Sequence, residues 1–209
     1  MNTYQIRIEL ARYRPRIWRR LLVKPDLPLS DFHLAIQIAM GWDNSHLHQF
    51  IRDRKFYSER LEEDWTWDDR YNIDYAGMRI SDLLEKENDK IEYEYDFGDG
   101  WVHEIKLEKI LPADDTMKSP VCMGGALACP PEDCGGIWGY AQMLEALKDP
   151  GHEQHEETIE WIGEEFDPDF FDVEAVNKLL KKHLKYRISK TYLSKGDYRS
   201  LPMAIKRHF

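Results

Sequence analysis

The sequence has few cysteines, no long hydrophobic run and no excess of positive charge. A membrane-spanning helix needs roughly 18 to 20 consecutive apolar residues, and no stretch of this chain approaches that length. Residues 1–4 lead directly into an alternating pattern and contain no apolar signal core. These absences argue against secretion and membrane insertion, and we therefore expect a cytoplasmic protein.

The three cysteines, Cys122, Cys129 and Cys134, all fall within one segment. An odd number in a single cluster does not match the disulfide framework of a small secreted protein. The C-x6-C-x4-C spacing also differs from that of a zinc finger, which uses closely spaced pairs and four ligands. We expect buried thiols that pack a loop, and the two acids before Cys134 should raise the pKa of its thiol.

The chain of 209 residues carries 29 basic and 39 acidic groups, a net charge of -10, and these charges are unevenly distributed. Residues 1–24 have a net charge of +6, residues 25–174 of -25, and residues 175–209 of +9. Within the centre, segment 153–174 holds ten acids and no lysine or arginine. The acidic total argues against nucleic-acid binding over the whole surface. The basic ends are either solvated faces or strips that contact phosphate or an acidic partner.

Hydrophobic periodicity predicts strands in the first half and helices in the second. Alternating apolar residues indicate strands over 4–10, 17–23, 46–51, 91–97 and 102–110. Helical spacing and capping residues indicate helices over 31–40, 81–87 and 137–148, another that includes 159–162, and one that begins after Asp172. Asp99-Gly100 favours a type I′ hairpin turn, whereas 59–74 and 112–136 read as irregular segments. We predict one α+β domain, an antiparallel or mixed sheet of about five strands covered by helices.

Histidines and carboxylates near the predicted hairpin form a candidate metal site. His46 and His48 are two residues apart on a predicted strand, so both side chains point to one face. Asp96, Asp99 and His103 lie in or beside the hairpin turn, and Glu132 and Asp133 are further carboxylates beside a turn that could join the site. Imidazoles and carboxylates together ligate zinc, manganese or iron, and such a site would polarise water for hydrolysis. Alternatively, the two aspartates accept hydrogen bonds from turn N–H groups, and His103 pairs with a carboxylate.

A second group of candidates precedes the helix predicted over 137–148: Glu132, Asp133 and Cys134, followed by two glycines. Two acids make phosphate an unfavourable ligand there, although a helix N-terminus attracts anions. We expect both acids to cap the helix and to pair with the arginine run Arg16, Arg19 and Arg20. We also expect a set of aromatic residues to pack in the core around this loop, namely Trp18, Trp42, Trp101, Trp138 and Tyr140.

Five strings of the sequence resemble one known family. They are PRIWRR at 15–20, HLHQF at 46–50, YDFGDGWVH at 95–103, PPEDCGG at 130–136 with Gly139-Tyr140, and FDP at 166–168. Together they resemble the plasmid pRiA4b ORF-3-like family over residues 3–182. The resemblance implies a single α+β domain and no established activity. We assign this domain to residues 1–186, and residues 187–209, which lie beyond the resemblance, form a basic C-terminal extension.

Some members of that family carry a transposon-resolvase label. A serine recombinase needs its nucleophile on an N-terminal strand with arginines around the phosphate. The superficially similar string Tyr186-Arg187-Ile188-Ser189 lies near the C-terminus, after a helix. We therefore do not expect recombinase chemistry.

Two functional hypotheses remain. The first is a non-enzymatic binding or adaptor module, linked to plasmid or mobile-element genes, with a protein partner. On this view nucleic acid could be contacted only through the basic C-terminal extension. The second is a metal-dependent hydrolase of the phosphoesterase or nuclease type, with a divalent zinc or manganese ion held by the histidines and carboxylates above. Because no catalytic signature with tight spacing is present, the sequence favours the first.

Overall fold

The computed structural model describes residues 2–60, 67–163 and 166–185. The strings outside these ranges include the recombinase-like residues 186–189 and the basic extension 187–209, so the predictions made for them stay predictions. No helix within the described ranges is long and apolar enough to cross a membrane.

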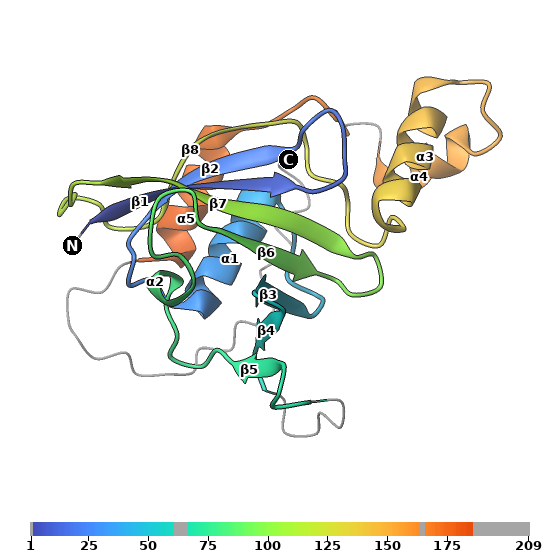
Figure 1. The fold of residues 1–209 in the computed structure, drawn as a ribbon. Coiled ribbons are helices and arrows are strands. Elements are labelled where there is room, and N and C mark those ends of the chain that lie inside the picture. Colours follow the sequence, from blue (N-terminus) through green and yellow to red (C-terminus); the bar gives the residue numbers. More distant parts are fainter. Residues whose placement is uncertain (1, 61–66, 164–165, 186–209) are drawn as a thin grey trace.

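One mixed sheet of eight strands organises the fold (Figure 1). Its strands are β1 (Thr3–Leu10), β2 (Trp18–Val23), β3 (His48–Arg52), β4 (Lys55–Ser58), β5 (Asn72–Asp74), β6 (Lys90–Tyr95), β7 (Trp101–Leu111) and β8 (Val121–Ala126). They lie in the order β5-β4-β3-β6-β7-β1-β2-β8. All neighbours are antiparallel except β4 and β5, which run parallel.

Five helices accompany the sheet: α1 (Leu29–Met40), α2 (Ile80–Leu83), α3 (Gly136–Lys148), α4 (His155–Ile162) and α5 (Val173–His183). Helices α1 and α5 contact each other on one side of the sheet, whereas α3 and α4 pair with each other at one end of it (Figure 1). Ten of the twelve residues of α1 are buried, because the helix is enclosed between the sheet and other elements. The core is completed by inward side chains of β1, such as Ile6 and Ile8.

The predicted α+β class is confirmed, but the prediction of about five strands is wrong because three further strands are present. Strand β8 lies inside the segment predicted as a loop; its residues Gly124 and Gly125 hide any alternating pattern. It forms by pairing with β2, a partner a hundred residues away in sequence. Strands β4 and β5 are only four and three residues long, too short for a periodic signal.

The hairpin between β6 and β7 also differs from the prediction. The strands were expected to end at 97 and to begin again at 102, with Asp99-Gly100 in a type I′ turn, but they are joined by the five residues 96–100. Asp96 leaves the strand with a left-handed backbone (φ 54°), and its carbonyl accepts a hydrogen bond from the Gly100 N–H. Aspartate adopts this conformation more readily than most residues. The longer connection places Asp96 at the end of the sheet rather than within it.

The guanidinium of Arg19 is buried at the junction of three elements. Its side chain is 1% exposed and donates hydrogen bonds to the carbonyls of Ala39, Ala126 and Leu127, and of its own neighbour Trp18. The ring of Phe171 lies 4.0 Å from the guanidinium carbon. The group thereby joins β2 to the end of α1, the end of β8 and the segment before α5.

The predicted pairing of the arginine run with Glu132 and Asp133 is therefore wrong. Arg19 binds carbonyl oxygens, Arg16 pairs with Glu9 at 2.7 Å, and Arg20 pairs with Glu108 at 2.6 Å. The sequence could not distinguish these arginines, because their partners are chosen by strand register. In β2, residue 19 points into the core, whereas residue 20 points to the opposite face.

We expect Arg19→Met to destabilise the fold by about 3 kcal/mol or more, because it leaves several buried carbonyl oxygens without donors. Urea unfolding followed by circular dichroism measures this loss. The matched variant Arg20→Gln removes a partly exposed ion pair and should cost less than about 1 kcal/mol. Equal losses in the two variants would contradict the structural role assigned to Arg19.

Candidate metal centre

Side chains from three loops converge at one end of the sheet. The Nε2 atom of His46, just before β3, lies 3.1 Å from Asp133 Oδ1 and 3.8 Å from both Asp96 Oδ2 and Glu132 Oε2. The donor atoms of His46, Asp96 and Asp133 lie within 4.8 Å of one another. The buried Nε2 atom makes no hydrogen bond, because none of these approaches has hydrogen-bond geometry. The imidazole nitrogen and the carboxylate oxygens therefore face a common point.

Glu132 is the most firmly held member of this cluster. Its carboxylate accepts hydrogen bonds from the Asp43 backbone N–H at 2.8 Å, from the Tyr95 hydroxyl at 2.9 Å and from the Ser45 hydroxyl. Burial raises the pKa of Glu132, and its contact with the Asp43 carboxyl raises it further. Sequence reasoning missed Ser45 and Tyr95 in this role, since a hydroxyl that orients a carboxylate has no motif of its own.

The backbone that carries the cluster is shaped by aspartate and glycine. Asp96 and Asp133 both have left-handed conformations, with φ values of 54° and 59°. Asp99 Oδ2 accepts a hydrogen bond from the Gly135 N–H, which ties the 96–100 turn to the loop before α3. A Cβ atom on Gly136 would lie 2.5 Å from the Asp99 carbonyl oxygen, so only glycine permits this approach. The two acid-bearing loops are thus fixed against each other.

Several sequence-based predictions for this region need correction. Asp99 does not join the converging donors, since it binds the backbone of Gly135. Glu132 and Asp133 do not cap α3, whose N-cap is Gly135 without a side-chain cap. Asp96 does accept a hydrogen bond from a turn N–H group, that of Gly98, as the alternative interpretation held.

His48 lies in the core rather than in the cluster. Its ring stacks on that of His33 from α1, with centroids 3.4 Å apart, and its Nε2 atom contacts the Tyr75 hydroxyl at 2.8 Å. His33 Nε2 binds the Asn44 amide oxygen, and its Nδ1 contacts the Tyr93 hydroxyl. An amide oxygen only accepts, so the proton of the neutral His33 ring sits on Nε2. This network uses His48 for packing and not as a ligand.

His103 is likewise buried, with 0% exposure, and no carboxylate of the described residues pairs with it. Its Nδ1 atom contacts the Trp101 carbonyl at 3.0 Å, and its ring meets the edge of Trp42. Trp101, Trp42 and Tyr140 are buried as predicted, and the Trp42 indole donates to the Pro130 carbonyl. Trp138 is 84% exposed, so its predicted place in the core is wrong.

The cysteines act as predicted from their context. Cys122 is buried, and Cys129 and Cys134 are partly buried thiols without disulfides. Burial raises the pKa of Cys134 to about 12, and the carboxylates of Asp99 and Asp133 contribute. A thiol with this pKa is a poor nucleophile at neutral pH.

Comparisons with known proteins agree with the fold and the sequence strings. A family model described as plasmid pRiA4b ORF-3-like protein matches residues 2–175. The chain belongs to the plasmid pRiA4b ORF-3-like family. The uncharacterized protein y4hQ of Sinorhizobium fredii is 40% identical over 164 residues, which cover 78% of this chain and 81% of that protein.

A solved structure supports the family's fold. The protein of unknown function MM3350 from Methanosarcina mazei Go1 is 35% identical, with a TM-score of 0.74 over 83% of this chain and 96% of its own. Neither relative's name states an activity. The site of this pRiA4b ORF-3-like protein must therefore be interpreted from its own chemistry.

Acid should destabilise the protein through its buried histidines. Burial lowers the pKa of His33 and of His103 to about 4, whereas an unfolded histidine titrates near 6.5. As the pH falls, the histidines of the unfolded chain bind protons before those of the folded chain. The contribution of these histidines to the free energy of unfolding is therefore complete above about pH 6.5, and it is lost as the pH falls through about 4. Each ring contributes about 3 kcal/mol to this loss. Urea unfolding at stepped pH values between these limits measures it.

The variant His33→Gln cannot titrate and should make stability less dependent on pH over that range. The control His152→Gln changes a partly exposed histidine of the α3–α4 connection and should leave the dependence unchanged. A wild-type stability that stays constant between pH 6.5 and 4 would refute the assignment.

Proposed function

We propose that this protein binds a divalent cation between His46, Asp96, Glu132 and Asp133, and that the cation activates water for hydrolysis. The observation that carries the proposal is the convergence of one imidazole nitrogen and several carboxylate oxygens on a common point. Ligand bonds of about 2.1 Å place two donors on one ion at most about 4.2 Å apart. The separations of 3.1 and 3.8 Å from His46 Nε2 fall within that limit, and all three donor atoms of His46, Asp96 and Asp133 lie within 4.8 Å of one another, so a small side-chain adjustment would bring them onto one ion.

The donor set favours manganese over zinc. Three carboxylates and one imidazole make a mainly oxygen site, and such sites suit manganese and other hard cations. A divalent ion would also offset the electrostatic repulsion among these carboxylates, two of which, Asp96 and Glu132, are largely buried. The ion would favour the ionised form of Glu132, whereas burial alone opposes it.

The open side of the cluster supports a catalytic rather than a purely structural ion. The Asp133 side chain is 72% exposed, so solvent reaches the cluster at this carboxylate, whereas the Nε2 atom of His46 is buried. A catalytic metal keeps a position for water and lowers the pKa of that water. Leu47 and Phe97, the neighbours of His46 and Asp96 in sequence, are 57% and 50% exposed. Such apolar side chains offer a contact surface to a substrate.

The charge at the site favours an uncharged substrate over a phosphoester. With a divalent ion, three ionised carboxylates still leave a net negative charge. A phosphodiester would be repelled by that charge, whereas a neutral ester or amide would not. We therefore propose hydrolysis of a neutral ester or amide, in place of the phosphoester expected from the sequence.

Mn²⁺ should bind the wild-type protein with a stoichiometry of one, as measured by titration calorimetry. His46→Ala and Asp133→Asn each remove one donor and should weaken binding at least about tenfold. The control His152→Ala removes a histidine outside the cluster and should bind Mn²⁺ like wild type. The proposal fails if wild type binds neither Mn²⁺ nor Zn²⁺, or if all three variants bind equally.

The rate of hydrolysis should depend on bound metal and should be higher for a neutral than for an anionic substrate. We expect the Mn²⁺-loaded protein to hydrolyse p-nitrophenyl acetate faster than the anionic bis(p-nitrophenyl) phosphate, with loss of this activity on chelation. His46→Ala should abolish the chelator-sensitive part, whereas His152→Ala should retain it. Metal binding without any chelator-sensitive hydrolysis would leave a cation-binding module and refute the catalytic role.

A further inference from the structure

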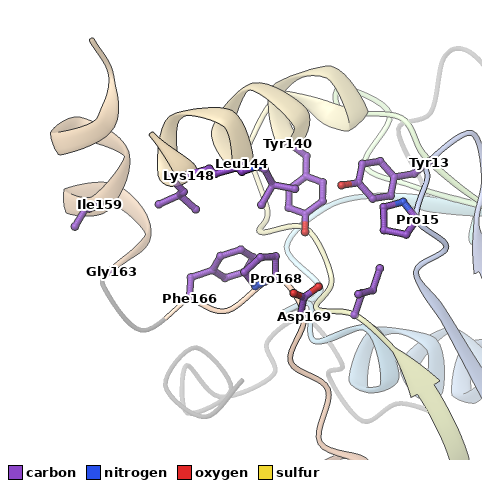
Figure 2. A pocket seen from close by; sticks show the side chains of 12 residues that line it. Tyr13, Pro15, Tyr140, Leu144, Lys148, Ile159, Gly163, Phe166, Pro168 and Asp169 are labelled. Carbon is purple, nitrogen blue, oxygen red and sulfur yellow. The ribbon is translucent and has the colours of Figure 1, made fainter. Parts of the chain in front are cut away.

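A separate cavity of about 550 Å³ lies between α3, α4, the turn that joins β1 to β2, and the segment 166–169 (Figure 2). Its volume lies in the range of small-ligand and side-chain pockets. None of the metal-centre residues lines it. Its function therefore does not depend on the proposed metal site.

One end of the cavity is polar and aromatic. Tyr13 and Tyr140 line it with ring centroids 5.2 Å apart, and the Tyr140 hydroxyl points toward the Asp169 carboxylate (Figure 2). Tyr140 is 1% exposed, and no hydrogen bond from another described residue reaches its hydroxyl. Burial raises the pKa of Tyr140, and the charge of Asp169 contributes, in agreement with their proximity. The Tyr140 hydroxyl is not one of the fully buried unpaired atoms of the described residues, so it is open to the cavity and can bind a polar ligand group.

The rest of the cavity is apolar. Leu144 and Leu147 of α3, Ile159 of α4 and Phe166 line it, and Lys148 lies at its rim. The cavity thus combines an apolar channel with an end that holds one carboxylate, two hydroxyls and aromatic faces. A fully apolar ligand that covered the Tyr140 hydroxyl would bury it without a partner, at a cost that a polar head group avoids.

The charges of the residues near the cavity favour a cationic ligand over an anionic one. Segment 153–174, which supplies α4 and one wall of the cavity, carries ten acids and no basic residue. The nearby Arg14 and Arg16 both pair with Glu9, so they do not neutralise Asp169. Aromatic faces together with a carboxylate attract ammonium groups. Lys148 is the one basic side chain among the described residues that line the cavity.

We propose that this cavity receives a lysine side chain from a basic segment of a partner protein. The ammonium group would bind the Asp169 carboxylate, the Tyr140 hydroxyl and the aromatic faces, while its four-carbon stem lies along the apolar walls. The acidic surface around the opening complements further positive charges of the same segment. This occupant matches the binding-module hypothesis, which the sequence favoured.

Titration calorimetry with the full chain tests the proposal. The probe is the peptide acetyl-Arg-Leu-Lys-Leu-Arg-amide, and its control carries N-acetyl-lysine at the central position. The lysine peptide should bind at least about tenfold more tightly, because acetylation removes the charge that Asp169 recognises. Equal binding of the two peptides, or no saturable binding of the lysine peptide at about 1 mM, would overturn the proposal.

Matched variants distinguish binding of the peptide in the cavity from nonspecific binding to the acidic surface. Asp169→Asn and Tyr140→Phe should each weaken the lysine peptide severalfold, with the larger effect, about tenfold, at Asp169. Glu160→Gln makes the same charge change on an exposed residue of α4 and should alter binding less than about twofold. If Glu160→Gln and Asp169→Asn weaken binding equally, the peptide binds the acidic surface and not the cavity. Thermal unfolding of each variant establishes that the fold is retained.

Discussion

The buried guanidinium of Arg19 is the interaction on which the arrangement of the second half of the chain depends. An arginine taken out of water must find partners for its five donors, and here those partners are backbone carbonyls rather than a carboxylate. Burial accordingly lowers the pKa of Arg19 to about 10, so it remains charged at neutral pH. Its hydrogen bonds hold the end of β8 and the residues that follow against the core.

The segment that follows β8, which Arg19 holds in place, contributes residues to both candidate sites. Leu127, whose carbonyl binds Arg19, lines the cavity that also contains Tyr13 and Tyr140. A few residues later the Pro130 carbonyl binds the Trp42 indole, and Glu132 binds the residues between α1 and β3. The loop that looks unstructured in sequence is therefore fixed at successive points. This rigidity is what allows its acids to converge with His46 without regular secondary structure.

The acidic residues of the central segment 25–174 form two groups with different proposed roles. The carboxylates of Asp96, Glu132 and Asp133 are held together at the end of the sheet, a repulsive arrangement that a divalent cation would relieve. The described acids of 153–174 are mostly exposed, and one of them, Asp169, lines the cavity. The first group suits a metal ion, and the second suits an organic cation with an apolar stem.

The sequence by itself determined the family, the α+β class, the central strands and helices α1, α3 and α5, because strong periodicity and caps such as Asp172 are local signals. It also named His46, Asp96, Glu132 and Asp133 among the candidate ligands of the proposed metal site. Only the tertiary structure separated these from His48, Asp99 and His103, since burial and partners depend on strand register and on loops packed from distant segments. The same limit explains β8 and the cavity around Tyr140: each is made by residues about a hundred positions apart, whose contact no local pattern encodes.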